Sequence, residues 1–187
     1  MGDSIPPRSN LDCASGTKIY ASGTAGTPWR LLRGVIRLDT TTADGQAAFA
    51  SLAIAGDIVG CETLLFGAYT FNAIALTECR LSPWPEGVAD SDSLLASLAS
   101  AQRRAADLVA LRGGQAIDRV LGLIRLFANG AGQVILPTRQ DIADITDLRF
   151  ETISRIIKQL ERSHLLQPIR IEGVHATRSF ALAPAIG

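Results

Sequence analysis

The chain has little cysteine, no excess charge of either sign and no apolar run long enough to cross a membrane. Its cysteines are odd in number and far apart, at Cys13, Cys61 and Cys79. Such spacing is a poor framework for disulfides and fits a reducing compartment. The opening residues, MGDSIPPRSN, contain no hydrophobic stretch of the signal-peptide kind. We therefore expect a cytoplasmic protein that does not associate with membranes.

The balance of charge excludes one way of binding nucleic acid. The 18 basic and 18 acidic residues cancel, so the chain does not coat nucleic acid by charge alone. A specific DNA reader whose positive charge is concentrated on one helix stays open. The two histidines, His164 and His175, lie far along the chain from every cysteine, and no zone has the residues of a catalytic triad or a metal site. We therefore do not expect an enzyme.

Residues 1–89 have the pattern of short strands and turns. Apolar or alternating runs such as WRLLRGVIRLDTTT and QAAFASLAIAGDIVG contain or are followed by glycines, and Asp44-Gly45 lies between these two. Asp-Gly between such runs is a hairpin signal, because glycine takes the positive φ that the turn needs. Several short strands with regular turns predict an antiparallel sandwich or barrel.

Residues 90–112 change to a helical pattern. Apolar and small residues follow one another at alternating spacings of four and three, as in a helix–helix seam; they are Leu94, Leu98, Ala101, Ala105 and Leu108. Such a seam either joins two copies of the chain or packs on the chain's own barrel, and the sequence leaves both open. Arg112-Gly113-Gly114 is predicted to end the helix and form a hinge.

Residues 113–187 contain two helical patterns in close succession. Thr138 and Asp141 form a capping box at the start of the first. Asp147-Leu148 then separates this short helix from a longer one. Apolar and small residues fall at the offsets that two crossing helices need; they are Ile142, Ala143, Ile153, Ile156, Ile157 and Leu160. The pattern predicts a helix-turn-helix.

Two further elements flank this motif. Gln115 to Asn129 has a broad apolar face and predicts a helix that ends before Gly130. The tail LLQPIRIEGVHATRSFALAP alternates around Glu172-Gly173 and predicts a short β-hairpin.

The outward face of the longer helix carries charge. Arg155, Lys158 and Arg162 fall at i, i+3 and i+7 and share one side. Glu151 precedes Arg155 by one turn, and the two form either a helix-stabilising ion pair worth ~0.3–0.5 kcal/mol or a pair that reads bases in the major groove. Because the cap, the turn and the hairpin accompany this face, we favour base reading.

The same stretch resembles a known family. RQDIADITDLRFETISRIIKQLERSHLL is similar to the DNA-binding motif of the catabolite activator / fumarate–nitrate regulator (CRP/FNR) family of bacterial transcription regulators, whose E-T-[IV]-S-R core stands here as Glu151-Thr152-Ile153-Ser154-Arg155. IYASGTAGTPWRLLRGVIRL and IAGDIVG resemble the family's strand–glycine–strand pattern and its G-D-[IL]-[VF]-G turn. The resemblance extends from about Lys18 to Leu182.

The resemblance implies an α+β protein. A cyclic-nucleotide-binding-like antiparallel β-barrel (jelly roll) would occupy residues 1–89, a dimerisation helix and hinge 90–112, and a winged helix-turn-helix 113–187. A homodimer would bind a palindromic promoter site in double-stranded DNA and act with RNA polymerase. The residues that would read a TGA-type core are Glu151, Ser154 and Arg155. The residues expected on phosphates are Arg139, Arg149, Lys158 and Arg162.

Three positions depart from the family's pattern. Phe150 stands where the cAMP-responsive branch has arginine and the oxygen-sensing branch a small apolar residue. A phenyl ring contacts a thymine methyl but cannot hydrogen-bond guanine, so we expect a TTGA-type rather than a TGTGA-type site. Asp147 replaces the usual glycine of the turn, and Asp tolerates left-handed geometry better than most residues. Arg149 replaces the usual Ser or Thr cap, a loss of about 1 kcal/mol.

No cofactor is predicted. Thr70 and Phe71 stand where the family's cAMP pocket has Arg-Ser, and no arginine lies between Arg37 and Arg80, so phosphate recognition would be weak. The cysteines are too few for the four-cysteine iron–sulfur cluster of the oxygen-sensing branch. Both histidines lie outside the barrel, which excludes a His-ligated haem there, whereas a Cys-ligated haem stays open. A regulator that is active without an effector fits these residues.

The cysteines are expected to differ in role. Cys61 and Cys79 are interpreted as core thiols, and Cys13, near the N-terminus, is the candidate redox residue.

The sequence thus predicts a homodimeric, sequence-specific transcription regulator. The alternative is a small-molecule- or protein-binding module whose winged helix is an interaction surface. Steep salt dependence of DNA binding distinguishes the regulator from the module.

Overall fold

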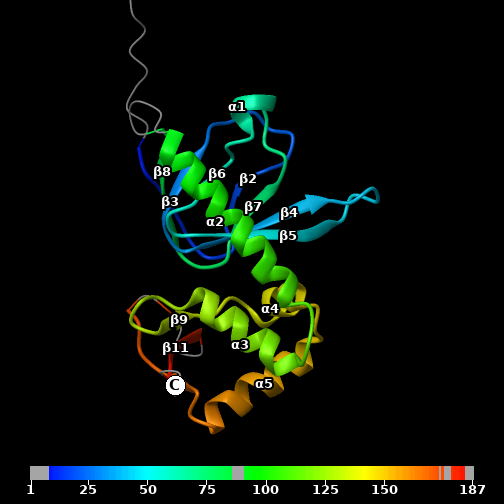
Figure 1. Ribbon diagram of the computed structural model, residues 1–187, viewed down its shortest axis with the longest axis vertical. Coiled ribbons are helices and arrows are strands. Elements are labelled where there is room, and N and C mark those ends of the chain that lie inside the picture. Colours follow the sequence, from blue (N-terminus) through cyan, green and yellow to red (C-terminus); the bar gives the residue numbers. More distant parts are fainter. Residues whose placement is uncertain (1–8, 86–90, 173, 175–177, 184–187) are drawn as a thin grey trace, which may run out of the picture. The chain divides into compact units, whose positions relative to one another are not determined.

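The structure is a computed structural model that describes residues 9–85, 91–172, 174 and 178–183. Its residues form two compact units, 1–103 and 104–187. The boundary between them falls inside the long helix α2 (Ser91–Ala110) (Figure 1). The chain is of the α+β class, as the sequence predicts.

The N-terminal unit contains two four-stranded antiparallel sheets. The first has the order β1 (Leu11–Cys13), β8 (Cys79–Pro83), β3 (Trp29–Arg33) and β6 (Ile58–Val59). The second has the order β2 (Lys18–Tyr20), β7 (Asn72–Ala75), β4 (Val35–Thr41) and β5 (Ala47–Ile54). The predicted antiparallel barrel is therefore confirmed, whereas β1 and the short helix α1 (Thr63–Phe66) were not predicted.

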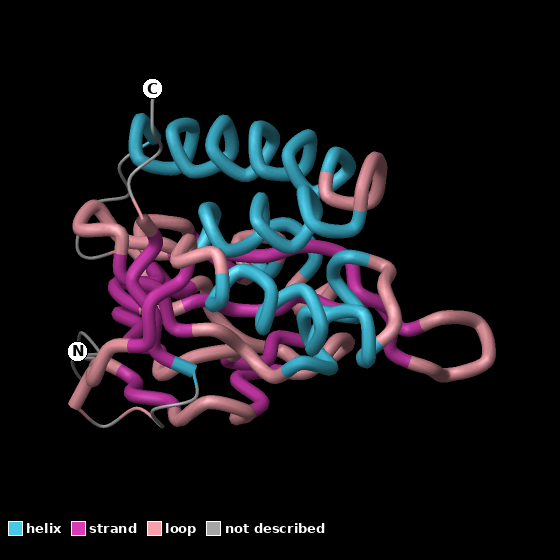
Figure 2. Tube along the Cα trace, turned by 90° about the horizontal axis from the view of Figure 1, so that it is seen from below, coloured by secondary structure: helices cyan, strands magenta, loops and turns pink. Residues whose placement is uncertain are grey.

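Two glycines explain how the chain turns between strands. Gly34 has φ 98° and divides one apolar run into β3 and β4, which belong to different sheets. A Cβ at Gly34 would lie 2.7 Å from the Cys79 sulfur, so a side chain does not fit. Gly45, at φ 82°, lies in the predicted turn of the β4–β5 hairpin. This hairpin stands out from the rest of its unit in Figure 1 and Figure 2.

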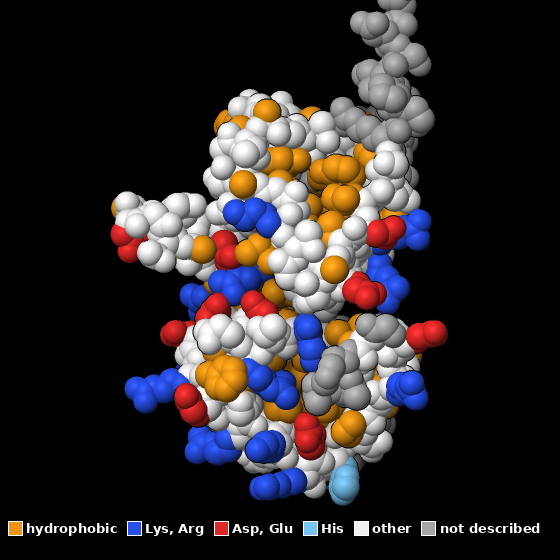
Figure 3. Space-filling model, turned by 180° about the vertical axis from the view of Figure 1, so that it is seen from behind, with side chains coloured by type: hydrophobic (Ala, Val, Ile, Leu, Met, Phe, Trp, Pro, Cys, Tyr) orange, Lys and Arg blue, Asp and Glu red, His pale blue; other side chains and the backbone are white. Residues whose placement is uncertain are grey.

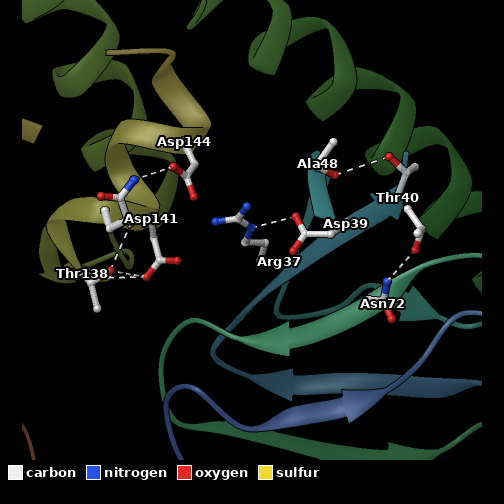
Figure 4. A network of polar contacts seen from close by, with 10 residues as sticks. Arg37, Asp39, Thr40, Ala48, Asn72, Thr138, Asp141 and Asp144 are labelled. Carbon is white, nitrogen blue, oxygen red and sulfur yellow. Dashed lines mark hydrogen bonds and ion pairs between the residues drawn. The ribbon is translucent and has the colours of Figure 1, made fainter. Parts of the chain in front are cut away.

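The barrel core is apolar and contains an internal charge pair. Alternate residues of the strands point inward and are fully buried, among them Leu31, Ile36, Ala73, Ala75 and Leu81. Arg37 donates from Nε to a carboxylate oxygen of Asp39 at 2.7 Å on the same strand (Figure 4). Both side chains are nearly buried, and burial of a charge is tolerated because the partner is bonded to it.

Helix α2 has a covered side and an open apolar side. Leu108 is buried, with 6 % of its surface exposed, whereas Leu95, Leu98 and Val109 are 62 %, 50 % and 74 % exposed. Of the predicted seam, Leu98, Ala101 and Ala105 are exposed, Leu94 is half-buried and Leu108 packs inside its own chain. The helix ends at Ala110, just before the predicted Arg112-Gly113-Gly114 stretch.

The C-terminal unit packs three helices against a small sheet. The helices are α3 (Ala116–Phe127), α4 (Arg139–Thr146) and α5 (Phe150–Arg162). The sheet has the order β10 (Leu166–Pro168), β11 (Ser179–Leu182), β9 (Gln133–Ile135). The predicted hairpin is confirmed by the pairing of Leu166 with Leu182; Gly173 at its predicted turn lies outside the described residues. Strand β9 was not predicted.

No helix among the described residues is long and apolar enough to cross a membrane.

Candidate nucleic-acid interface

Helix α4 begins at the predicted capping box. The Thr138 hydroxyl accepts a hydrogen bond from the Asp141 backbone N–H at 3.1 Å, and the Asp141 carboxylate accepts from the Thr138 N–H at 3.2 Å (Figure 4). Two backbone donors that the helix itself leaves without partners are satisfied in this way. The capping box therefore fixes where α4 starts.

The turn after α4 has left-handed geometry. Asp147 has φ 53° and ψ 48°, and its N–H donates to the Ala143 carbonyl. The Leu148 N–H donates to the same carbonyl at 3.1 Å. The expectation that Asp147 takes the role of a turn glycine is confirmed.

Two arginines from outside the motif also hold this turn. The side chain of Arg112 donates to the Ile145 carbonyl at 3.4 Å, and that of Arg119 to the Thr146 carbonyl at 3.3 Å. These carbonyls lie in the last turn of α4, where helix geometry leaves them without intrahelical donors. The sequence predicted neither contact: Arg112 was assigned to a hinge, and nothing in the local pattern of either arginine relates it to carbonyls so far along the chain.

Helix α5 presents one apolar side to its own unit. Ile153, Ile156, Ile157 and Leu160 are at most 4 % exposed, and Ile142, Ala143 and Ile145 of α4 are also buried. Each inward residue that the sequence predicted for the two helices is buried. The N-cap residue Arg149 has extended backbone geometry and makes no side-chain capping bond, as its residue type predicted.

The other side of α5 is polar and open. Glu151, Arg155, Lys158 and Arg162 are exposed, Phe150 is 48 % exposed and Ser154 is half-buried. Lys and Arg side chains gather over the C-terminal unit on the face drawn in Figure 3. Within the described part of the chain, no ion pair joins Glu151 to Arg155. Both side chains therefore remain available to another molecule.

Arg139 has a different environment from the other basic residues. It is half-buried at the start of α4. Burial lowers the pKa of its guanidinium from the usual value, the nearby Glu161 opposes this shift, and Arg178 adds to it. Arg139 thus has less open surface for a phosphate than Arg149, Lys158 or Arg162, all of which are exposed.

Aromatic rings fill part of the barrel beside Thr70 and Phe71, which stand at the positions of the family's cAMP pocket. Tyr69 stacks on Tyr20 with ring centroids 3.8 Å apart, and its hydroxyl donates to the Thr27 carbonyl at 2.7 Å. A Cβ added at Gly60 would lie 2.6 Å from the Tyr69 ring. The next residue, Thr70, is exposed, and Phe71 is half-buried.

The cysteines lie in the barrel unit. Cys13 and Cys79 are buried and Cys61 is half-buried, so the expectation of a core thiol holds for Cys79. The described residues contain no group of three or more histidine, cysteine, aspartate or glutamate side chains arranged to hold a metal ion.

These features together define a class of protein. A capped helix, a tight turn and a second helix with a basic open face, followed by a paired β-hairpin, form a winged helix-turn-helix. Such a module following an antiparallel barrel is the architecture of DNA-binding transcription regulators with a sensor-like domain.

Comparison of the sequence with known proteins identifies relatives within this class. No family model matches the sequence. The nitrogen fixation regulation protein FixK of Bradyrhizobium diazoefficiens is 30 % identical over 192 residues, which covers 87 % of this chain and 80 % of that protein. FixK of Rhizobium meliloti is 30 % identical over 168 residues, 86 % of this chain and 79 % of that protein.

Solved structures have the same fold. A CRP-family transcriptional regulator of Thermus thermophilus superposes with a TM-score of 0.70 at 24 % identity, over 92 % of this chain and 91 % of that one. FixK2 of Bradyrhizobium japonicum gives 0.68 at 24 % identity, over 94 % and 92 %. The chain belongs to the CRP/FNR family of transcription regulators, which bind DNA and are not enzymes.

Proposed function

We propose that the protein acts as a homodimer on a palindromic promoter site with a TGA-like core and needs no bound effector. In this proposal residues 1–89 are the sensor-like barrel, 90–112 the dimerisation helix and hinge, and 113–187 the DNA-binding domain. The open polar face of α5 carries the proposal, because its side chains are exposed on a helix whose opposite side is buried.

The base-reading residues are Glu151, Ser154 and Arg155. A guanidinium donates two parallel hydrogen bonds to guanine O6 and N7, and a carboxylate accepts from cytosine N4. Glu151 and Arg155 stand one helical turn apart, both exposed, so that they reach neighbouring base pairs when α5 lies in the major groove. Phe150 precedes them and contacts a thymine methyl, which favours a TTGA-type half-site.

The phosphate-contacting residues are Arg149, Lys158 and Arg162, with Arg139 at the start of α4. Their positive charges bracket the base-reading side chains along the motif. Phosphate contacts of this kind set the register of a helix in the groove and contain no sequence information.

The homodimer forms through the open face of α2. Leu98, Ala101 and Ala105 of the predicted seam are exposed, and Leu95 and Val109 extend the same face at spacings of three and four. In this proposal Leu95 and Val109 take the places of Leu94 and Leu108 at the ends of the seam. Leu94 is half-buried, and Leu108 is buried in its own chain. Small residues at its centre let two helices approach closely.

Independence from an effector is supported by the interior of the barrel. The stacked Tyr20 and Tyr69 rings occupy space beside Gly26 and Gly60, where added Cβ atoms would collide with the Tyr69 ring. Arg37 is the last arginine before Thr70-Phe71, the cAMP-pocket position, and its side chain is already bonded to Asp39. We therefore expect the regulator to act on RNA polymerase at promoters in the cytoplasm without a small-molecule signal.

The first experiment selects sites from random duplex DNA with the purified, ligand-free protein. A recovered palindrome of the TGA…TCA form supports the proposal, including its effector-free part. If binding is diffuse or absent, either an effector is required or the winged helix is an interaction surface for another molecule.

Two variants then separate base reading from phosphate binding. Arg155→Ala should cost ~1–3 kcal/mol on the selected site and relax preference at one base pair of each half-site. Lys158→Ala should weaken selected and unrelated sequences alike. Binding isotherms on the selected site and on single-base variants of it measure both effects; an equal loss on all sequences for both variants contradicts the assignment.

A further inference from the structure

Two of the three cysteines lie opposite each other in the barrel. Cys13 on β1 is paired in register with Cys79 on β8, and these strands are antiparallel neighbours in the first sheet. Residues directly opposite in an antiparallel pair have Cα atoms ~4.5–5.5 Å apart. That separation lies inside the range of about 4.4–6.8 Å found in disulfides.

The two thiols also share one face of the sheet. Cys13 and Cys79 are 7 % and 3 % exposed and point into the core, as their neighbours Leu11 and Leu81 do in part or fully. The adjacent pair in the register, Asp12 on β1 and Arg80 on β8, points outward. The distance between Arg80 Nε and an Asp12 carboxylate oxygen is 3.8 Å. A register in which one pair of side chains is outward therefore places both cysteines inward.

The chemistry of the pair favours a slow, reversible reaction. Burial raises the pKa of the Cys79 thiol to about 11, and the neighbouring Cys13 adds to this shift. Burial, and then the charge of Asp12, raise the pKa of Cys13 above its usual value. Cys79 Sγ is 3.4 Å from the carbonyl oxygens of Val35 and Thr77, which share the single thiol proton as acceptors. A thiol held neutral in this way reacts sluggishly until it is deprotonated.

Access to the pair comes through β1. This strand has three residues, pairs with β8 alone among the strands that the structure describes, and is an edge of that sheet. Short edge strands with few ladder bonds open at low free-energy cost compared with global unfolding. Such opening exposes Cys13 before Cys79.

We propose that Cys13 and Cys79 are a reversible dithiol–disulfide site, closed by a peroxide or by a small-molecule disulfide. With a disulfide oxidant the Cys13 thiolate attacks one oxidant sulfur and forms a mixed disulfide, releasing one thiol. The Cys79 thiolate then attacks Sγ of Cys13 and releases the second thiol. Both cysteines are oxidised together by two electrons, the oxidant is reduced to two thiols, and no other group is consumed.

With hydrogen peroxide the same bond forms through a sulfenic acid on Cys13, and two molecules of water are released. In a reducing compartment, disulfides of this kind are transient rather than structural. The bond would tie β1 to β8, the strand that precedes α2.

The test uses the full chain, reduced and then treated with oxidised glutathione or hydrogen peroxide. Free thiols are blocked with N-ethylmaleimide, and the peptides are mapped by mass spectrometry without reduction. We expect a Cys13–Cys79 peptide pair linked within one chain, with Cys61 blocked. The bond should raise the Tm by roughly 10 °C, and its formation should accelerate about tenfold per pH unit between pH 7 and 8.5.

Matched variants keep the outcome clear. Cys79→Ala should leave glutathione permanently attached to Cys13, Cys13→Ala should leave Cys79 unreacted, and Cys61→Ser should oxidise as the unchanged protein does. If Cys79→Ala does not fold, Cys13→Ala still provides the test. Its position on a short edge strand means that the barrel should stay intact. The proposal is overturned if Cys13 and Cys79 are both blocked by N-ethylmaleimide after oxidation, if glutathione stays on Cys13 of the unchanged protein, or if linkage occurs only between chains.

Discussion

Asp147 determines how tightly the two helices of the motif can be joined. Its left-handed backbone, at φ 53° and ψ 48°, is costly for most side chains and free for glycine. Asp147 is exposed, so its replacement changes backbone strain more than packing. The residue shows that the family's glycine can be replaced where the geometry itself is kept.

We expect Asp147→Gly to raise the free energy of unfolding by ~0.5–1 kcal/mol, because glycine removes the left-handed cost but gains freedom when unfolded. Asp147→Val should lower the same quantity by ~1–2 kcal/mol, since a β-branched side chain tolerates this region poorly. Urea unfolding followed by circular dichroism measures both. Equal midpoints for the valine and aspartate proteins would show that the turn relaxes to another geometry.

Phe150 sets the expected difference from the TGTGA-type sites of the cAMP-responsive branch. Phe150→Arg replaces a ring that contacts a methyl group with a donor that can hydrogen-bond guanine. We expect preference between matched TTGA and TGTGA palindromes to move toward TGTGA by at least ~1 kcal/mol. Competition binding of the two sites measures the change, with Phe150→Ala as the control that removes the ring without adding a donor. A shift as large with alanine as with arginine contradicts a role for guanine recognition.

At the scale of elements, the covered side and the open side of α2 are expected to have different roles. Leu98→Glu puts a charge on the exposed face, so it should shift the protein to monomers in sedimentation equilibrium and weaken palindrome binding at least ~10-fold. Leu108→Ala empties a buried position and should lower the free energy of unfolding by ~2–5 kcal/mol. Arg103→Glu, an exposed position on another side of α2, is the control. Dimers that persist with Leu98→Glu contradict the proposed face.

At the scale of the whole molecule, zero net charge places the electrostatic part of DNA binding on the motif. Two copies of the four proposed phosphate contacts predict a slope of about −7 for log K against log salt concentration. Lys158→Ala should reduce its magnitude by about 2, one for each protomer. Filter binding across a salt series measures the slope. A slope near zero would favour the interaction-module alternative.

Local patterns in the sequence were sufficient for much of the fold. The capping box at Thr138, the inward residues of α4 and α5 and the Asp44-Gly45 hairpin were predicted because each depends on spacings of a few residues. Strands β1 and β9 were missed, because three-residue strands have too short a pattern and are stabilised by pairing with distant partners.

The sequence by itself determined the class of the longer elements, the position of α5 and its basic face. Only the tertiary structure decided which side of α2 is covered, since the predicted seam contains both the exposed Leu98 and the buried Leu108, and burial of Leu108 depends on distant residues. The same is true of the pairing of Cys13 with Cys79 and of the support of Arg112 and Arg119 for the turn. These contacts join residues far apart in the chain, and their partners are set by sheet register and helix packing rather than by local spacing.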